Sequence, residues 1–407
     1  NGMPVRIGPW PSDTTAWYRN DQPKRYCLDA THPGAERWLR DLFDTLVNNW
    51  GFEMIKIDFV AWTVFSAQQF SDPGVSPAMV YRKTLQLIRS VAGDRCHILD
   101  CGPGNISGEF ITSMRIEYDQ NYGYAPQAWG QYFSGSSCSA GAAGKRYFYH
   151  NKVWTNDVDH VCIDILSYPN AQAAATLIGL SGGNTMSGDR LLNLDAIRLD
   201  ILRKIFPATI EPGRPADLFD NDPQSVFVCH LSRPFGTWDV VAFFNADREH
   251  SLSRSFGLDR LWLDPARKYL CFDFWNERLA GEITGTMKVD VNPGSVALFS
   301  LREEKGHPQV AGTNRHVKMG AVEIRDEHFD TNTSVLSVTS AGPAGSMHSV
   351  FVYIPAGYDW APEGGRIYQT GAGYTIRKTE DNLLRVDVRF GEQEEIPWSV
   401  AFSTVKE

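Results

Sequence analysis

The stretch of residues 54–60, MIKIDFV, places a lysine and a carboxylate two positions apart in a run that is otherwise apolar. Such a run is typical of a β-strand, in which successive side chains point to opposite faces, so Lys56 and Asp58 share one face and Ile55 and Ile57 share the other. Charged groups on a buried strand cost free energy unless they are paired, solvated or used in chemistry. The pattern therefore indicates either a structural ion pair or an active-site pair in which the ammonium group keeps the carboxylate ionised.

A second candidate carboxylate lies in the stretch SMRIEYDQNYG, residues 113–123. Arg115 falls in a strand-like segment, and Asp119 lies just beyond it in a loop rich in tyrosine. If the chemistry is acid/base cleavage of a glycosidic bond, a second carboxyl group is needed, and Asp119 is the candidate, with Glu117 as its nearest rival. In isolation, the same residues also fit a surface ion pair.

The elements that must position these residues alternate between strand-like and helix-like segments in the first half of the chain. Apolar residues recur at helical spacing from Thr31, the expected N-cap, to Gly51, and again between Ser76 and Gly93. Repeated β-then-α units favour a parallel sheet or barrel with its helices outside and its catalytic groups at the carboxyl ends of the strands. The six expected strands, two fewer than a closed barrel has, lie at Pro4, Met54, His97, Met114, Val153 and around Leu180.

The second half of the chain has a different texture. The proline-rich stretch PATIEPGRPADLF, residues 207–219, indicates a domain boundary. Beyond it, short runs of alternating hydrophobicity separated by turn residues are typical of antiparallel β-sandwiches. We therefore expect the C-terminal part of a (β/α)8 barrel over residues 1–207, an antiparallel β-sandwich over residues 208–303, and a second β-rich module or extension over residues 304–407.

Composition and charge exclude several classes of function. The formal net charge of −9, with no block of Lys or Arg, disfavours a nucleic-acid or anionic-membrane partner. The sequence contains no run of about eighteen apolar residues, so it predicts no membrane span. The seven cysteines form no CxxC pair and the histidines show no HExxH spacing, so we predict mainly free thiols, no metal and no cofactor. The chain starts without an initiator Met or a signal-peptide pattern, which indicates that upstream sequence is missing, and its compartment cannot be read from this end.

An ordered series of segments resembles the melibiase-type α-galactosidase family of clan D glycoside hydrolases. The resemblance covers residues 4–206 and implies a retaining enzyme with a (β/α)8 barrel followed by a β-sandwich. Six matches in the same order rarely arise by chance, which makes the series more specific than any single segment. The segments are LDATHPGAERWLRDLF, WGFEMIKIDF, HILDCGPG, MRIEYD, WTNDVD and LSGGNTMSGD.

The resemblance assigns a role to each matching residue. It implies that Asp58 is the nucleophile and that Lys56 binds sugar hydroxyls. It likewise implies that Asp119 is the general acid/base and that Arg115 positions the sugar or the acid. Trp10, Cys101 and Gly102 match residues that line the family's sugar pocket, although packing explains each of them equally well.

Two departures from the family pattern bear on sugar specificity more than on reaction type. Glu117 and Tyr118 precede the acid/base where the family has a small residue or Gly and then Pro, and the family's acidic pair near the first barrel strand has no counterpart. Asp157, Asp159 and His160 could form a metal site, but the resemblance places their strand as a structural or substrate-edge element.

The function implied is a retaining hydrolase of terminal α-galactosyl or related residues, with the two carboxyl groups about 5 to 5.5 Å apart. A transglycosylase of the same barrel type, α-N-acetylgalactosaminidase or β-arabinopyranosidase specificity, and a carbohydrate-binding protein with a decayed site stay open. The expected partner is a carbohydrate substrate, and homo-oligomer formation is left open.

Overall fold

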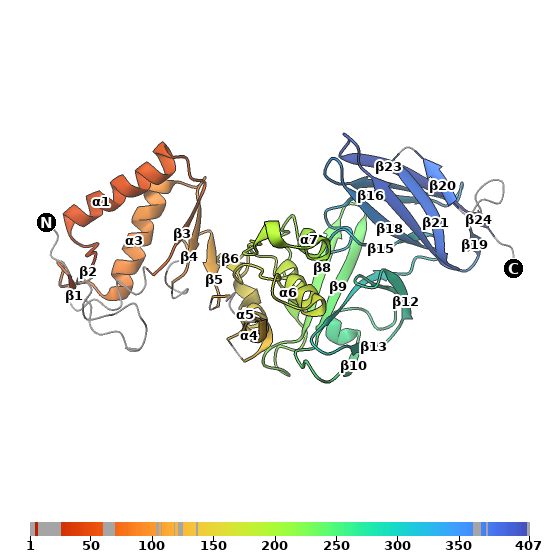
Figure 1. Cartoon of the computed structure of the whole chain (residues 1–407), viewed down its shortest axis with the longest axis horizontal. Coiled ribbons are helices and arrows are strands. Elements are labelled where there is room, and N and C mark those ends of the chain that lie inside the picture. The colour runs from red at the N-terminus through yellow and green to blue at the C-terminus, as the bar shows by residue number, and fades with distance from the viewer. Residues whose placement is uncertain are drawn as a thin grey trace. The chain divides into compact units, whose positions relative to one another are not determined.

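The chain forms two compact units (Figure 1). The computed structural model describes residues 5–6, 26–59, 70–102, 106, 108–117, 119–120, 125–135, 137–360, 368–371 and 373–404. Unit 1 comprises Asn1–Ile116 and Phe148–Asp157, and unit 2 comprises Glu117–Tyr147 and Val158–Glu407. The expected boundary at residue 207 lies within unit 2, and the division into three domains stays a prediction.

Unit 1 is built on a parallel four-stranded sheet whose strands follow one another in chain order. Helices α1 and α3 pack against each other, and α1 continues into a π-helical turn, η1. The two-residue strands β1 and β2 form a separate antiparallel pair. The elements are β1 (Val5–Arg6), β2 (Tyr26–Cys27), α1 (Pro33–Asp44), η1 (Thr45–Asn49), β3 (Met54–Ile57), α3 (Pro77–Ala92), β4 (His97–Asp100), β5 (Ser113–Arg115) and β6 (Thr155–Asp157).

Local signals explain where these helices start and end. Ser76 caps α3 by accepting a hydrogen bond from the Met79 N–H at 3.3 Å, and Gly93 ends the helix at a φ of 66°. The expected Thr31 cap of α1 is wrong, because the Thr31 hydroxyl accepts from the Asp72 N–H at 3.1 Å and donates to Asp29 at 2.6 Å. Instead, the His32 Nδ1 accepts from the Gly34 N–H at 3.0 Å.

Four of the six expected strands are confirmed as β3 to β6. The strand expected around Leu180 is wrong: the described residues there form helix α6 up to Leu180, and beyond it only a single bridge joins Val161 to Ser187. The strand expected at Pro4 is present only as the pair Val5–Arg6, which runs antiparallel to β2.

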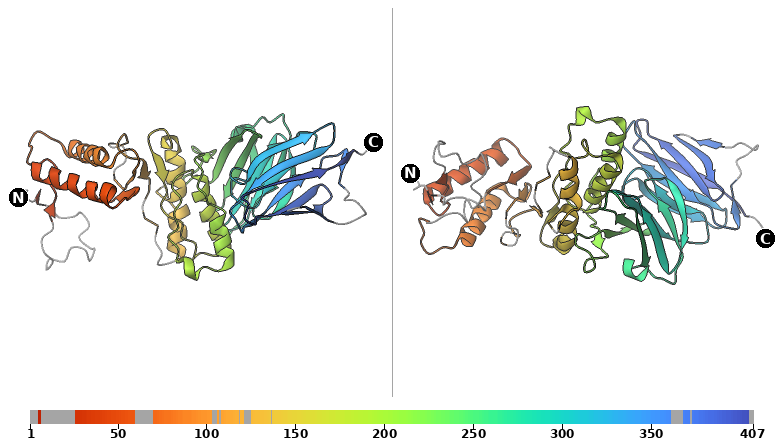
Figure 2. Two further views of the ribbon diagram at one scale, coloured as in Figure 1. Left: turned by 90° about the horizontal axis from the view of Figure 1, so that it is seen from above. Right: turned by 60° about the horizontal axis from the view of Figure 1, so that its bottom comes forward.

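Unit 2 contains four longer helices followed by antiparallel sheets. Figure 2 shows, in both of its views, the helices of unit 2 grouped on one side and the strands on the other. The helices are α4 (Ala125–Phe133), α5 (Ser139–Arg146), α6 (Tyr168–Leu180) and α7 (Ala196–Arg203), with short turns η3 (Leu191–Asn193) and η4 (Asp259–Leu261). A further short turn, η2 (Tyr147–Tyr149), lies where the chain passes from unit 2 to unit 1. No helix in the described part of the chain combines the length and apolar character needed to cross a membrane.

The first sandwich of unit 2 packs a six-stranded sheet, in the order β12-β11-β14-β9-β8-β7, against the two-stranded antiparallel sheet of β10 and β13. Its core consists of inward-facing residues such as Val241 and Phe243 from one sheet and Met287 and Val289 from the other. The strands are β7 (Arg214–Pro215), β8 (Val226–Arg233), β9 (Gly236–Phe244), β10 (Leu252–Gly257), β11 (Tyr269–Asp273), β12 (Arg278–Ile283), β13 (Thr286–Val291) and β14 (Val296–Glu303).

The second sandwich packs a five-stranded sheet, in the order β15-β18-β22-β21-β20, against the three strands β16-β17-β23. Val350 and Val386 from the first sheet meet Leu336 and Trp398 from the second in a buried core. The strands of these two sheets are β15 (Gln309–Thr313), β16 (Ile324–Asp330), β17 (Val335–Ala341), β18 (Met347–Tyr353), β20 (Tyr368–Gly371), β21 (Tyr374–Glu380), β22 (Leu383–Arg389) and β23 (Glu395–Ala401). The two-residue strands β19 (Tyr358–Asp359) and β24 (Ser403–Thr404) form a separate antiparallel pair. The expected class, α/β followed by antiparallel β-sandwich, is confirmed.

A buried segment after β15 ties the second sandwich to the connection that follows α7. The Lys318 Nζ donates to Thr209 Oγ1 at 2.5 Å and to the Glu211 carbonyl at 2.6 Å. His316 lies 3.1 Å from the Pro207 carbonyl through its Nε2. Burial lowers the pKa of both side chains, that of His316 to about 3.

Candidate active site

Four residues with chemistry-bearing side chains form a row across the carboxyl ends of the parallel strands of unit 1. Arg115 on β5 is the register partner of Asp157 on β6. Asp58 and Cys101 directly follow Ile57 and Asp100, which are register partners on β3 and β4. The Cys101 N–H donates to the Ile57 carbonyl at 3.0 Å, so the two strand ends stay joined at this row. Three predicted site residues, Asp58, Cys101 and Arg115, are thus brought to one edge of the sheet.

The charges near Cys101 also locate Lys56 at this edge. Burial raises the pKa of the Cys101 thiol to about 12, and the charges of Lys56, Asp58, Arg115 and Asp157 act on it as well. The thiol is therefore protonated at neutral pH, and Cys101 carries no charge beside the candidate nucleophile.

The predicted alternation along β3 is present in the structure. Ile57 is buried, whereas Lys56 and Asp58 are exposed. In the described part of the chain Lys56 and Asp58 form no ion pair with each other. The carboxylate of Asp58 is therefore not neutralised by the ammonium group of Lys56.

The chain turns sharply after Asp58. Phe59 has a φ of 59°, in the left-handed region that bulky residues rarely adopt. Its N–H donates to the Asp58 Oδ1 at 2.8 Å, so the carboxylate caps the turn that ends the strand. One oxygen of Asp58 is thereby oriented by the backbone.

Gly102 lies beside a buried hydrogen bond that the sequence does not predict. The hydroxyl of Tyr81 on α3 donates to the Asp100 carboxylate, and both side chains are fully buried. A Cβ on Gly102 would lie 1.9 Å from the Tyr81 hydroxyl oxygen. The space beside Gly102 is therefore filled by Tyr81. The only sequence signal for this network is the carboxylate that ends the apolar strand HILD.

Asp119 lies in unit 2, where its side chain is exposed. Its rival Glu117 accepts a hydrogen bond from the Ser139 hydroxyl at 2.7 Å and lies 3.3 Å from the Gln120 side-chain amide. Asp119 is the more accessible of the two carboxylates. Because Asp58 and Asp119 belong to different units, their separation stays a prediction. Trp10 lies outside the described residues.

The segment that contains Asp157, Asp159 and His160 serves both units. Asp157 belongs to unit 1, where it is the register partner of Arg115, and Asp159 belongs to unit 2, where its Oδ1 lies 2.9 Å from the His160 Nδ1. Within the described ranges, no three His, Cys, Asp or Glu side chains gather as a metal site. Cys96, Cys101, Cys138, Cys162, Cys229 and Cys271 are free thiols.

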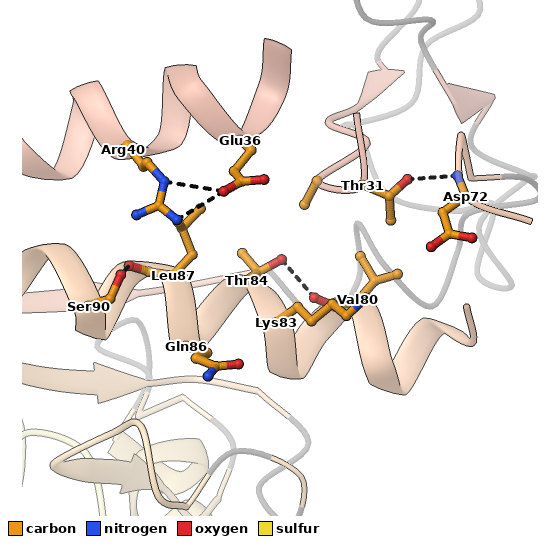
Figure 3. A pocket seen from close by; sticks show the side chains of 11 residues that line it. Thr31, Glu36, Arg40, Asp72, Val80, Lys83, Thr84, Gln86, Leu87 and Ser90 are labelled. Atoms are coloured by element: carbon orange, nitrogen blue, oxygen red, sulfur yellow. Dashed lines mark hydrogen bonds and ion pairs between the residues drawn. The ribbon is translucent and has the colours of Figure 1, made fainter. Parts of the chain in front are cut away.

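A separate groove of about 390 Å³ lies along α1 and α3 in unit 1 (Figure 3). Its rim includes the pair of Glu36 and Arg40, joined at 2.9 Å, and Lys83 of α3. The predicted site residues are not among those that line it, so this groove is distinct from the edge where Asp58 lies.

Comparison with known proteins supports the fold. No family model matches the chain. A solved structure of a GH27 β-L-arabinopyranosidase from Geobacillus stearothermophilus, in complex with arabinose, is 15% identical and has a TM-score of 0.54 over 74% of this chain and 68% of that one. Its wild-type form gives 16% identity and a TM-score of 0.51 over 69% of this chain and 64% of that one. An α-galactosidase I from Mortierella vinacea gives 13% identity and a TM-score of 0.49, over 65% of this chain and 71% of that one.

The chain thus spans about two thirds of the length of the solved structures that it resembles. At these identities the likeness establishes the fold of a barrel followed by a β-sandwich, as in GH27 enzymes. The described residues supply four parallel strands of the barrel part.

Proposed function

We propose that the protein is a retaining glycoside hydrolase that cleaves terminal α-galactosyl or closely related residues. The observation that carries the proposal is the row of Asp58, Cys101 and Arg115, with Lys56 beside it, at the carboxyl ends of the parallel strands. This is the edge at which enzymes of the barrel class hold their catalytic groups. Its mixture of carboxylate, ammonium and guanidinium groups suits a polyhydroxylated substrate.

The proposed mechanism proceeds in two steps. Asp58 attacks the anomeric carbon while Asp119 donates a proton to the leaving oxygen, which gives a covalent glycosyl-enzyme. Asp119 then acts as a base and removes a proton from water as the water displaces Asp58. Lys56 donates hydrogen bonds to sugar hydroxyls, and Arg115 holds the sugar or the acid in place. This mechanism requires the two carboxyl groups to lie about 5 to 5.5 Å apart, and a separation near 8 Å in a crystal structure would contradict it.

The choice of sugar is limited by chemistry. An α-D-galactopyranoside and a β-L-arabinopyranoside share their ring hydroxyl arrangement and differ by the hydroxymethyl group on C5. Two of the similar structures, with TM-scores of 0.51 and 0.54, are named as a β-L-arabinopyranosidase, which supports a sugar of this ring configuration. An N-acetyl group at C2 would need additional space near the pocket.

A panel of p-nitrophenyl glycosides tests the proposal: α-galactoside, β-L-arabinopyranoside, α-N-acetylgalactosaminide and α-glucoside. We expect release of p-nitrophenol from one of the first two, with NMR showing that the product keeps the anomeric configuration of the substrate. Glycosyl transfer to an added alcohol in place of free sugar would indicate a transglycosylase. A protein that binds galactose but is inert on the whole panel would contradict the proposed hydrolase.

A further inference from the structure

The peptide group that joins Asp119 to Gln120 is held at both of its polar ends. The Gln131 side-chain amide on α4 donates to the Asp119 carbonyl at 2.9 Å. The Gln120 N–H donates to the Asp159 Oδ2 at 2.7 Å. A peptide group is planar, so two hydrogen bonds at opposite ends fix the orientation of the whole plane. All four residues belong to unit 2.

Asp159 is a buried carboxylate that accepts hydrogen bonds from its neighbours, not a charge on the surface. It is 2% exposed and adopts a φ of 67°, which is uncommon for any residue except glycine. Its second oxygen, Oδ1, lies 2.9 Å from the His160 Nδ1. Both carboxylate oxygens are thus used as acceptors, and an amide could supply only one of them.

We propose that Asp159 is a positioning residue that aims Asp119 at the leaving group by fixing the Asp119–Gln120 peptide. This inference rests on the proposed function, in which Asp119 is the general acid/base. With the peptide plane fixed, the backbone rotation that would swing the Asp119 Cα–Cβ bond is restrained, even though the carboxylate itself is exposed. A misplacement of about 1 Å at a reacting group costs on the order of 100-fold in rate.

The substitution Asp159→Asn isolates this role. Asparagine tolerates a left-handed φ better than other non-glycine residues, so the backbone at position 159 is retained. One of the two acceptors becomes a donor, which opposes either the Gln120 N–H or the His160 Nδ1. The hydrogen bonds that Asp159 makes are weakened, and with them its hold on the Asp119–Gln120 peptide, while the size of the side chain is unchanged.

Dependence on the leaving group distinguishes positioning from a purely structural role. Protonation matters most for a poor leaving group and little for an activated one, because an activated phenolate departs without help from an acid. For Asp159→Asn we expect kcat/KM to fall by about 10- to 100-fold on a phenyl glycoside of the accepted sugar. On the 2,4-dinitrophenyl glycoside we expect kcat/KM to fall by less than about threefold, because this leaving group needs little protonation. The comparison uses kcat/KM because it reports on the step that forms the glycosyl-enzyme.

Azide provides a second readout. It attacks the glycosyl-enzyme without needing a general base, so it should raise kcat of Asp159→Asn on the dinitrophenyl glycoside and yield a glycosyl azide. The wild type should respond little to azide, and Asp119→Ala should respond most.

Asp217→Asn is the matched control. Asp217 is also fully buried and also holds backbone, accepting from the Ser225 N–H at 2.9 Å and the Val226 N–H at 3.1 Å, but it lies at the start of the first sandwich. We expect this variant to lose stability and to lose activity on both leaving groups by the same factor. Gln131→Ala replaces Asp159→Asn if that variant does not fold. It removes the hydrogen bond from the Gln131 amide to the Asp119 carbonyl, and Gln131 is only half-buried.

The outcomes separate the two proposals. An active wild type whose folded Asp159→Asn or Gln131→Ala variant loses the same factor on both leaving groups would overturn the positioning role and leave the proposed hydrolase intact. A wild type inactive on every glycoside would overturn the proposed function and this inference with it. A large loss confined to the poor leaving group, together with azide rescue, supports both.

Discussion

At the scale of single residues, the orientation of Asp58 makes it testable without disturbing the fold. Its carboxylate caps the turn at Phe59 through one oxygen, a contact that an asparagine carbonyl can also make. We expect Asp58→Asn to lower kcat by about 1,000-fold or more, because an amide cannot form the glycosyl-enzyme. Its thermal unfolding should match that of the wild type.

Asp72→Asn is the control for this substitution. Asp72 is exposed in unit 1, and its Oδ1 accepts from the Gly74 N–H at 2.9 Å, a comparable local contact. Normal activity in this variant and strong loss in Asp58→Asn would support the assigned nucleophile. Appreciable turnover by Asp58→Asn, once contamination by wild type is excluded, would contradict it.

Gly102 gives a second prediction at this scale. A methyl group at this position would overlap the Tyr81 hydroxyl, so we expect Gly102→Ala to lower the free energy of unfolding by about 1 to 3 kcal/mol. Tyr81→Phe removes the overlapping oxygen, at the cost of its hydrogen bond to Asp100. In the Tyr81→Phe background, Gly102→Ala should therefore cost less. Urea unfolding of the four proteins measures this coupling, and an equal cost in both backgrounds would contradict it.

Strand alternation accounts for the features that could be predicted from the sequence at this scale. Because side chains alternate along a strand, the exposure of Lys56 and Asp58 and the burial of Ile57 were predictable. The hydrogen bond between Tyr81 and Asp100 was not, because it joins a helix to a strand that no local pattern relates. The N-cap of α1 was assigned to Thr31 in error because the hydroxyl accepts from the Asp72 N–H, 41 positions away, instead of from the helix.

At the scale of elements, the strands that carry the candidate site were predictable, and the error around Leu180 has a physical cause. From Asn170 on, helix α6 is buried on nearly all sides, so its apolar residues fit the predicted helix over 170–180 but show no stripe that marks where the helix ends and a strand could begin. Gly182 and Gly183 then end the helix without starting a strand. The sequence pointed to Asp159 only as a possible metal ligand or structural residue, because its hydrogen bond with the Gln120 N–H joins residues 39 positions apart.

The buried Lys318 supports a prediction about how α7 and the second sandwich are joined. Lys318→Met would leave the Thr209 hydroxyl and the Glu211 carbonyl without their ammonium partner, and we expect a loss of about 1 to 3 kcal/mol in the free energy of unfolding. Lys288→Met, at an exposed position on β13, should change it by less than about 0.5 kcal/mol. Guanidinium unfolding measures both, and a Lys318→Met variant as stable as the wild type would show that the ammonium group is dispensable.

At the scale of the whole molecule, the ordered series of segments predicted the fold class, whereas the division into units was not predictable. Asp157 and Asp159 are two positions apart in the sequence but fall into different units. The unit to which a segment belongs depends on which distant parts of the chain it contacts. A local sequence pattern carries no information about those contacts. For the same reason the alternation of β and α segments could predict a parallel sheet without predicting which helices pack with it.

Two buried histidines make unit 2 sensitive to acid. Burial lowers the pKa of His316 and of His348 to about 3, whereas an unfolded histidine titrates near 6.5. Below pH 6.5 the unfolded chain therefore binds protons that the folded chain does not, and the free energy of unfolding falls as the pH falls. Each histidine should cost up to about 1.4 kcal/mol per pH unit well below pH 6.5, or roughly 1.6 kcal/mol between pH 6.5 and 5.

His348→Phe tests this account because the His348 ring already packs on Phe390, with 5.2 Å between ring centroids, and its two nitrogens have no hydrogen-bond partner among the described residues. We expect the free energy of unfolding of this variant to fall by about 1.6 kcal/mol less than that of the wild type when the pH is lowered from 6.5 to 5, measured by chemical denaturation. His250→Gln, at an exposed site beside Asp247, should behave like the wild type. If His348→Phe and the wild type lose the same free energy over this interval, then His348 takes up its proton in the folded state and is not the source of the acid sensitivity.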